Sequence, residues 1–160
     1  MAERVTLDQL ARRFVAAPAK FHVSVNLAMV QAAILVRDTA VKKFGTYQPA
    51  VGEYPAWEPL KPETVARKEA AGSAGDDPLI GHYAGKRSNK AWPAPLRMTI
   101  SMHVEDWVAQ VGSDDPLAEY HEYGTVNIPP RPFLRPSLFE KAEEVHALVS
   151  EGMFVALRAL

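Results

Sequence analysis

The sequence predicts one α+β domain, in which a long N-terminal helix and a C-terminal helix pack on a small, mainly antiparallel β-sheet with long partner-ordered loops. Three observations predict this fold. Apolar residues recur with helical spacing through residues 18–44, alternate with polar residues through 96–104, and recur with helical spacing again through 136–158. A chain of 160 residues has the length of a single domain, and its 48% hydrophobic residues suffice for a core without disulfides or metals.

Residues 1–45 form a helical region. Thr6-Leu7-Asp8-Gln9 has the spacing of a capping box and predicts a short first helix. Pro18 suits the first turn of a second helix, because the N–H group that proline lacks has no partner in that turn. Gly45 is the expected end of this helix. A helix over 18–44 would be about 40 Å long and would run the whole domain or project beyond it. Its predicted inner face is Val23, Leu27, Val30, Ile34, Val41 and Phe44.

Residues 46–95 are rich in loops, and only Pro62–Ala71 has a helical pattern. Long loops without secondary structure are uncommon in compact domains and are usually functional. We therefore expect 46–60 and 73–95 to become ordered only on assembly. Trp57 and Trp92 would then be covered by a partner, with packing on their own domain as the alternative.

Residues 96–135 are expected to form a β-hairpin and an extended, proline-rich arm. A strand begins at Leu96, the chain turns at Glu105-Asp106, and Trp107–Gly112 returns antiparallel. Pro116–Tyr123 predicts one or two helical turns that end at Gly124. The residues of 126–135 must be extended because their prolines exclude a helix.

A last helix is predicted over 136–158, within a C-terminal region of residues 136–160. Gly152 weakens the middle of this helix by about 1 kcal/mol relative to alanine. The residues available for its inner face are Leu138, Ala142, Val145, Val149 and Leu157.

Charge is balanced overall but unevenly distributed. The formal net charge is −1, yet residues 1–45 hold seven Lys/Arg against three Asp/Glu, while residues 96–160 hold five against ten. The balance argues against nucleic acid bound through a generally basic surface. The asymmetry could steer the basic half of one copy toward the acidic half of another, and two solvated helix faces of opposite sign are the alternative.

Several classes of protein are excluded or disfavoured by what the sequence lacks. Without cysteine there is no disulfide scaffold, Cys-ligated zinc or thiol nucleophile. No apolar run of about 18–20 residues predicts a membrane span, and the N-terminus lacks the apolar core of a signal peptide. We expect no membrane association, no cofactor and no bound metal.

No catalytic motif is complete. His121-Glu122 begins like a zinc-protease helix, but Thr125 stands where the second histidine is required. Residues 81–86 resemble a phosphate loop that is one residue short and is followed by Arg87. We expect no enzyme; a small metal-dependent hydrolase is the least favoured alternative, and its residues would be Asp114, Asp115, Glu119 and His121.

The most unusual segment runs from Tyr120 to Pro136. Its prolines stiffen an extended arm that carries Phe133 and Leu134 between two arginines. Stiffness lowers the entropy lost on docking, and arginine with aromatic residues is typical of interface hot spots. The alternative is a crossover that packs Phe133 into the core of its own domain.

The residues YHEYGT…IPPRPFLRPSL resemble the signature near the C-terminus of tail-completion, or head–tail joining (neck), proteins of long-tailed bacteriophages and gene-transfer particles, also called virion morphogenesis proteins. Upstream, Trp57 to Lys68 resembles a stretch of the Mu-type branch, although Gly81-His82-Tyr83 stands where that branch has a Thr-Gly-x-Leu turn. The resemblance covers roughly residues 57–158. The positions that match the signature are Tyr120, Glu122, Gly124, Thr125, Pro130, Arg131, Pro132, Phe133 and Pro136.

The resemblance implies a non-enzymatic virion protein that forms a hexameric ring at the neck. Such a ring joins the portal and connector proteins to the tail terminator or tail tube, and genomic DNA passes through it without sequence-specific contacts. Assembly would take place in the cytoplasm of the bacterial host. A tail terminator or minor tail protein is the alternative. The expected interface residues are Tyr120, Glu122, Gly124, Thr125, Pro130, Arg131, Pro132, Phe133, Arg135, Trp57 and Trp92.

Overall fold

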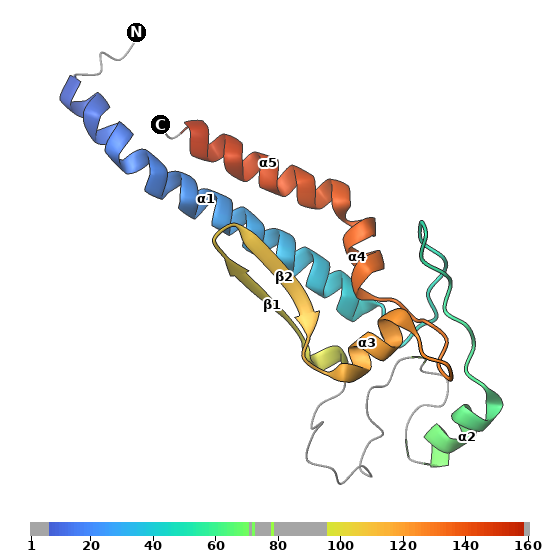
Figure 1. Ribbon diagram of the computed structural model, residues 1–160. Helices are drawn as coiled ribbons and strands as arrows, with labels where there is room; N and C mark the ends of the chain where they lie inside the picture. The colour runs from blue at the N-terminus through green and yellow to red at the C-terminus, as the bar shows by residue number, and fades with distance from the viewer. Residues whose placement is uncertain (1–6, 71, 73–77, 79–95, 159–160) are drawn as a thin grey trace.

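A computed structural model describes residues 7–70, 72, 78 and 96–158. Helices combine with one antiparallel pair of strands, which confirms the predicted α+β fold (Figure 1). The elements in chain order are α1 (Leu7–Lys42), α2 (Pro62–Ala70), the 3-10 helix η1 (Leu96–Met98), β1 (Ile100–Glu105), β2 (Val108–Ser113), α3 (Pro116–Tyr123), α4 (Leu134–Glu140) and α5 (Ala142–Arg158).

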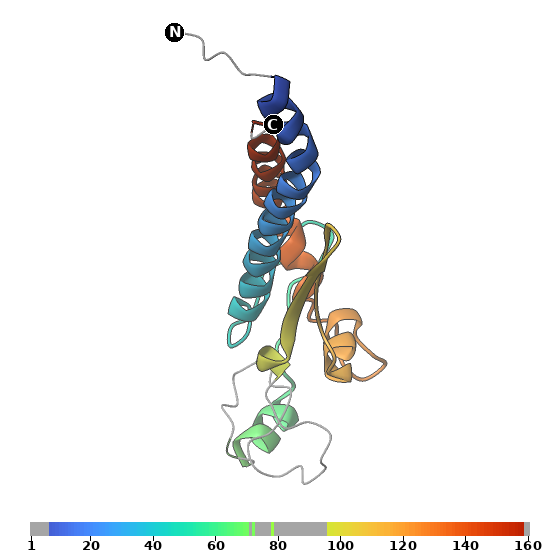
Figure 2. The same ribbon diagram turned by 90° about the vertical axis from the view of Figure 1, so that its left-hand side faces the viewer.

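The N-terminal region is one continuous helix of 36 residues, so the prediction of two helices is wrong. Pro18 lies inside α1 and not in the first turn of a separate helix. An interior proline removes one hydrogen bond of the helix, but here its ring is exposed and the helix continues through it. The N-terminal part of α1 extends past the end of α5 (Figures 1 and 2).

Helix α1 has three sides with different surroundings. Helix α5 lies antiparallel along one side and the β1–β2 hairpin packs on a second (Figure 1). On the third side Val23, Leu27 and Ile34 are 67%, 59% and 38% exposed, so the predicted inner face is wrong at these positions. Among the α1 residues whose side chains the structure describes, the buried ones are mostly small: Val25, Ala28, Ala32, Ala33, Val36 and Ala40.

The small residues are buried because α1 and α5 approach each other closely. A β-carbon on Gly152 of α5 would lie 2.5 Å from Cβ of Ala28 and 3.2 Å from the carbonyl oxygen of Ser24. Larger side chains do not fit between helices at this separation. The low helix propensity of Gly152 weakens α5, but its lack of a side chain allows the two helices to pack.

The hairpin is held on α1 through its turn. The strands pair from Ile100 with Ser113 to Glu105 with Val108, so the turn residues are Asp106 and Trp107, one position later than expected. Both have positive φ, 45° and 67°, as the two central residues of a type I′ turn require. The backbone N–H of Trp107 donates to Oδ1 of Asn26 in α1 (3.2 Å).

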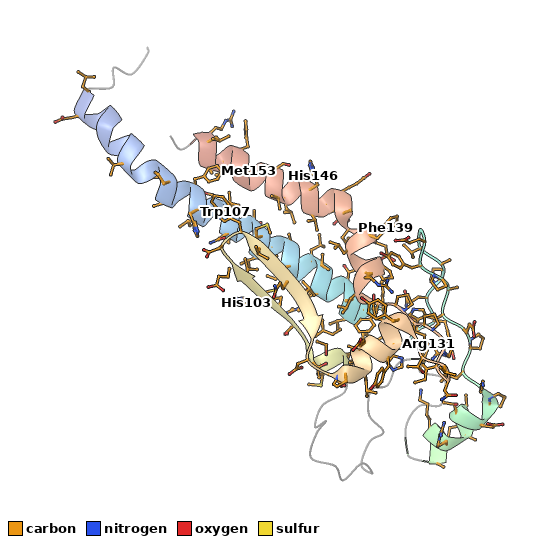
Figure 3. All side chains as sticks on the ribbon, in the orientation of Figure 1. His103, Trp107, Arg131, Phe139, His146 and Met153 are labelled. Atoms are coloured by element: carbon orange, nitrogen blue, oxygen red, sulfur yellow. The ribbon has the colours of Figure 1, made fainter. Side chains whose placement is uncertain are left out.

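The Trp107 ring also packs on α1. It lies edge-on to the ring of Phe21, with the centroids 5.8 Å apart, and against His22 at 5.6 Å. Figure 3 shows Trp107 at the tip of the hairpin beside α1. The tip is thus fixed to the helix by a hydrogen bond and by aromatic contacts, which compensate for its unfavourable backbone conformation.

Segment 46–60 is ordered against its own chain, so it needs no partner to take its conformation. Val51 and Tyr54 form an isolated β-bridge. Between them Gly52, with a φ of +55°, lies so close to the ring of Phe139 that a β-carbon would be 2.7 Å from it. Trp57 is buried on its own domain, which is the alternative to a partner contact. The second loop, 73–95, lies outside the described residues except for Pro78, and so does Trp92.

The C-terminal region is two helices rather than one, because the chain changes direction at Lys141 between α4 and α5 (Figure 1). Helix α4 begins at Leu134 and not at Pro136, so the prediction that 126–135 is extended is wrong for its last two residues, whose N–H groups are capped by Glu122. Two of the predicted inner-face residues, Leu138 and Leu157, are more than half exposed. The main core instead lies at the C-terminal end of α1, where the hairpin, α3 and the arm meet. Its buried residues are Ala40, Trp57, Leu96, Ile100, Ala118 and Phe133.

We predict that Gly152→Ala destabilises the protein even though alanine is the better helix former. The added methyl group collides with Ala28, and overpacking of this kind costs about 1–3 kcal/mol. The free energy of unfolding from urea titration measures the effect. Ser150→Ala, at an exposed position of α5, is the control. Adding Ala28→Gly should recover part of the loss, and an unchanged Gly152→Ala protein would contradict the close approach.

Candidate functional site

The segment from Tyr120 to Pro136 is organised by the carboxylate of Glu122, whose side chain is buried at the end of α3. Its Oε2 accepts hydrogen bonds from the backbone N–H groups of Phe133 (2.8 Å) and Leu134 (3.0 Å). Its Oε1 accepts from the backbone N–H of Arg135 (2.9 Å). These are amides at the start of α4, whose N-cap residue supplies no side-chain cap. Glu122 therefore caps α4 from another helix, where a negative charge is favourable.

Arg135 reinforces this contact. Its Nε donates to Oε1 of Glu122 (3.1 Å) and its Nη2 donates to the carbonyl oxygen of Glu122 (2.9 Å). The guanidinium lies 4.4 Å from the ring centroid of Tyr123 and 5.3 Å from that of Tyr54. One arginine thus connects α3, α4 and the 51–54 turn.

Gly124 and Thr125 form the turn that sends the chain from α3 into the arm. Gly124 has a φ of +76°, and a β-carbon on it would lie 2.9 Å from the backbone nitrogen of Pro130. The Oγ1 of Thr125 accepts from the backbone N–H of Ile128 (3.1 Å), while the Thr125 N–H donates to the Ile128 carbonyl (2.8 Å). The Gly-Thr pair is thus explained by local geometry.

The arm itself is fastened to α3 and to segment 46–60. The backbone N–H of Arg131 donates to the carbonyl of His121 (2.6 Å), and its Nη2 donates to the carbonyl of Glu58 (2.8 Å). The indole N–H of Trp57 donates to the carbonyl of Pro132 (3.0 Å). Phe133 is fully buried with its ring edge-on to Phe44 at 5.0 Å. The arm is therefore a crossover packed into its own core.

These contacts divide the expected interface residues into two groups. Side chains buried in their own chain cannot contact another subunit, so the expectation is wrong for Glu122, Arg131, Pro132, Phe133 and Trp57. The residues that remain exposed or partly exposed, and for which an interface role stays a prediction, are Tyr120, Gly124, Thr125, Pro130 and Arg135. Trp92 lies outside the described residues.

A cleft of about 640 Å³ lies between residues 58–68 and residues 125–131, with His121 and Arg131 in its wall. Burial is the main reason that the pKa of His121 falls from 6.5 to about 4. The positive charge of Arg131 lowers it further, and Asp115 acts in the opposite direction. Burial also lowers the pKa of Arg131. Figure 3 shows Arg131 where α3 and the arm meet.

The carboxylates considered for a hydrolytic metal site have separate surroundings. Asp115 is buried and caps α3 by accepting from the backbone N–H of Leu117 (2.9 Å), whereas Asp114 and Glu119 are exposed. Within residues 7–70, 72, 78 and 96–158, no three His, Cys, Asp or Glu side chains are grouped so that they could hold a metal ion. The metal-dependent hydrolase therefore gains no support from this region.

Two apolar surfaces that the sequence analysis missed lie on the long helices. We call the first the groove face: Val23, Leu27 and Ile34 of α1 with Leu148 and Val155 of α5. We call the second the α5 outer face: Met153, Phe154 and Leu157, which are 44%, 54% and 56% exposed. They were missed because the helical period shows that a side is apolar but not which side a partner helix covers.

The stretch Pro18–Lys42 of α1 is long and apolar enough to cross a membrane by length and composition, and 28% of its most apolar window is buried. A core helix of a soluble protein meets the same criterion, so this is weak evidence. Its apolar character nevertheless makes a lipid surface one of the occupants to test for the groove face.

Comparison with known proteins gives no match, whether with protein-family models, curated proteins or solved structures.

We predict that Glu122→Gln lowers the free energy of unfolding by roughly 3 kcal/mol. Three backbone N–H groups and the Nε of Arg135 donate to the two oxygens of the carboxylate, and the amide of glutamine has only one acceptor oxygen. Thermal and urea unfolding measure the loss. The control is Glu119→Gln, an exposed position on the same helix. Equal stability of the two variants would show that the Glu122 cap is not important.

We predict that His121 makes the protein sensitive to acid. The folded state keeps the ring neutral down to about pH 4, while the unfolded chain binds a proton near pH 6.5. The free energy of unfolding is therefore highest above pH 6.5 and falls as the pH drops toward 4, because the unfolded state takes up a proton that the folded state does not. The loss is about 2 kcal/mol between pH 7 and 4.5. Urea unfolding across this range should show a shallower pH dependence for His121→Gln than for the exposed-site control His146→Gln.

Proposed function

We propose that this chain is a structural virion protein that assembles as a ring at the head–tail junction of a long-tailed phage or a related particle. The ring joins the portal and connector proteins to the tail and continues the DNA channel. The observation that carries the proposal is the pair of uncovered apolar surfaces on α1 and α5. Exposed apolar surfaces of this kind mark sites of protein or membrane interaction.

The resemblance of the Tyr120–Pro136 segment to the neck-protein signature supplies the place in the virion. In this chain most of the signature residues build a buried support: Glu122 caps α4, Gly124 permits the turn, and Phe133 fills the core. A signature made of such residues is consistent with a family that shares a folding unit rather than a catalytic centre.

The shape of the chain suits a ring subunit. It is elongated, with α3 and the arm at one end and the N-terminal part of α1 at the other (Figures 1 and 2). The apolar surfaces lie along the sides of the helices, where they favour contacts with neighbouring subunits. The α3–arm end, with the exposed residues Tyr120, Thr125 and Arg135, is then available for contacts with the proteins above or below the ring.

The proposal predicts that particles produced without this gene separate into DNA-filled heads and free tails of normal length. Negative-stain electron microscopy of the lysate makes the measurement, and a plasmid copy of the gene should restore tailed particles. Tails of abnormal or variable length would favour the tail terminator alternative. Intact tailed particles would overturn the proposal.

A further inference from the structure

We infer that the groove face of one copy receives the α5 outer face of a second copy of this chain. The inference names the lateral contact within the proposed ring, and only the closure into a ring at the virion neck rests on the proposed function. The association of two copies stands on the surfaces themselves.

The groove face is an apolar strip beside a hollow between two helices. Val23, Leu27 and Ile34 are spaced by four and seven residues, which puts them on one side of α1 over about 16 Å. Next to them is a cavity of about 440 Å³ between α1 and α5, with Ile34 on one wall and Leu148 on the other. Val155 follows Leu148 by seven residues, two helical turns, and so continues the same side of α5.

The residues of the α5 outer face point away from the side of α5 that carries Leu148 and Val155 of the groove face. Met153 is two residues before Val155, which places it about 200° around the helix, and Leu157 lies one turn after Met153. Figure 3 shows Met153 on α5. Phe154 lies on the side of α5 turned away from α1, because it is two residues after Gly152, which touches Ala28. One copy can therefore use both apolar surfaces at the same time.

Charge favours contact between the two unlike surfaces over contact between like ones. Helix α1 carries five basic and two acidic residues, and α5 carries three acidic and one basic. The groove face lies on both helices, which together carry six basic and five acidic residues, so the acidic α5 of a second copy is attracted to it. Two α5 outer faces placed together would repel each other.

Unpaired charges beside the two surfaces point the same way. Lys42 lines the groove and forms no ion pair within the described part of the chain, whereas the groove acids Asp38 and Glu144 are paired with Arg37 and Lys141. Glu143 lies three turns before Phe154 on the outer side of α5 and also has no ion-pair partner among the residues described. Other charges limit this complementarity to one end of the contact, because Arg158 lies 4.5 Å from the Phe154 ring centroid and Glu151 lies on the groove side of α5. The complementary pair is therefore Lys42 at one end of the groove and Glu143 at the start of the outer side of α5.

A contact between two unlike surfaces of identical chains has a defined consequence. Each copy offers one groove face and one α5 outer face, so the contact can repeat from copy to copy, into a ring if its rotation closes and into an open filament if it does not. A contact between two identical surfaces would stop at a dimer. The arrangement of the two apolar surfaces is therefore the one that a ring requires.

The test uses two variants that each block one surface. Leu27→Asp places a charge on the groove face, and Leu157→Asp places one on the α5 outer face; both positions are more than half exposed, so the fold should tolerate the change. Val126→Asp, at a fully exposed position outside both surfaces, is the matched control. Circular dichroism checks helix content, and analytical ultracentrifugation measures the mass of each protein alone and of an equimolar mixture.

We expect the unmodified chain and the Val126→Asp control to form oligomers larger than a dimer, and each blocked variant to be a monomer. The mixture should form a complex of twice the chain mass, because only the intact groove of one variant and the intact outer face of the other can meet. A mixture that stays monomeric would overturn the inference. So would a blocked variant that still forms the full oligomer or a stable dimer with itself.

Two further results are decisive. An unmodified chain that stays a monomer would overturn the contact. Flotation of the chain with phosphatidylglycerol vesicles that is lost in Leu27→Asp would also overturn it, and would assign the groove face to a lipid surface. The experiment separates the two proposals. If the blocked variants lose their oligomers but particles produced without the gene keep their tails, the contact stands and the proposed function falls. If the unmodified chain is a monomer but particles produced without the gene have heads separated from tails, the function stands and the contact falls.

Discussion

The carboxylate of Glu122 is the interaction on which the arrangement of the C-terminal half depends. It accepts three backbone N–H groups and the Nε of Arg135, and it is buried where α3 ends and α4 begins. An unpaired buried carboxylate would be strongly unfavourable, so the arm must return to this point. The return fixes the start of α4, and α4 in turn sets where α5 begins its path along α1. The start of α5 therefore depends on a capping contact between two residues that are thirteen positions apart in the sequence.

A second constraint, the close approach of α1 and α5, decides which surfaces remain uncovered. Gly152 and Ala28 bring the helices together, and this uses the small residues of α1 for the interior. The larger apolar residues of α1 are left on the remaining side. In a protein that worked alone, such an arrangement would leave favourable burial unused. It becomes favourable overall when a neighbouring copy covers the residues that the small-residue interface leaves outside.

Local patterns predicted the elements well and their contacts poorly. The bounds of α3 agree with the prediction because Pro116 and Gly124 are strong local signals. Alternation predicted the antiparallel pair of strands, but the predicted start at Leu96 is wrong. Leu96–Met98 is the 3-10 helix η1, because the backbone N–H and the Oγ1 of Thr99 both donate to the Leu96 carbonyl, and β1 begins at Ile100. The continuation of α1 through Pro18 was not predicted, because a proline has the same sequence signal whether it opens a helix or lies inside one. The break at Lys141 was not predicted, because no glycine or proline stands beside it. Glu122 was predicted as an interface residue. Its role as a cap for a helix that begins twelve residues later has no sequence signal, because the spacing of a capping box is local.

The proposed assembly requires a chain that is stable by itself and can also associate. The α3–arm end and the long helices would meet these two demands differently. At the α3–arm end the prolines and the Glu122 contacts hold the backbone rigid, so exposed residues there can meet a partner with little loss of conformational entropy. Along the helices the apolar surfaces are supported by continuous backbone hydrogen bonding and by packing at Ala28 and Gly152. Neither surface has to fold during assembly. A subunit of this kind can therefore use most of the free energy of apolar burial for association, because the cost of ordering its surfaces is met when the chain folds.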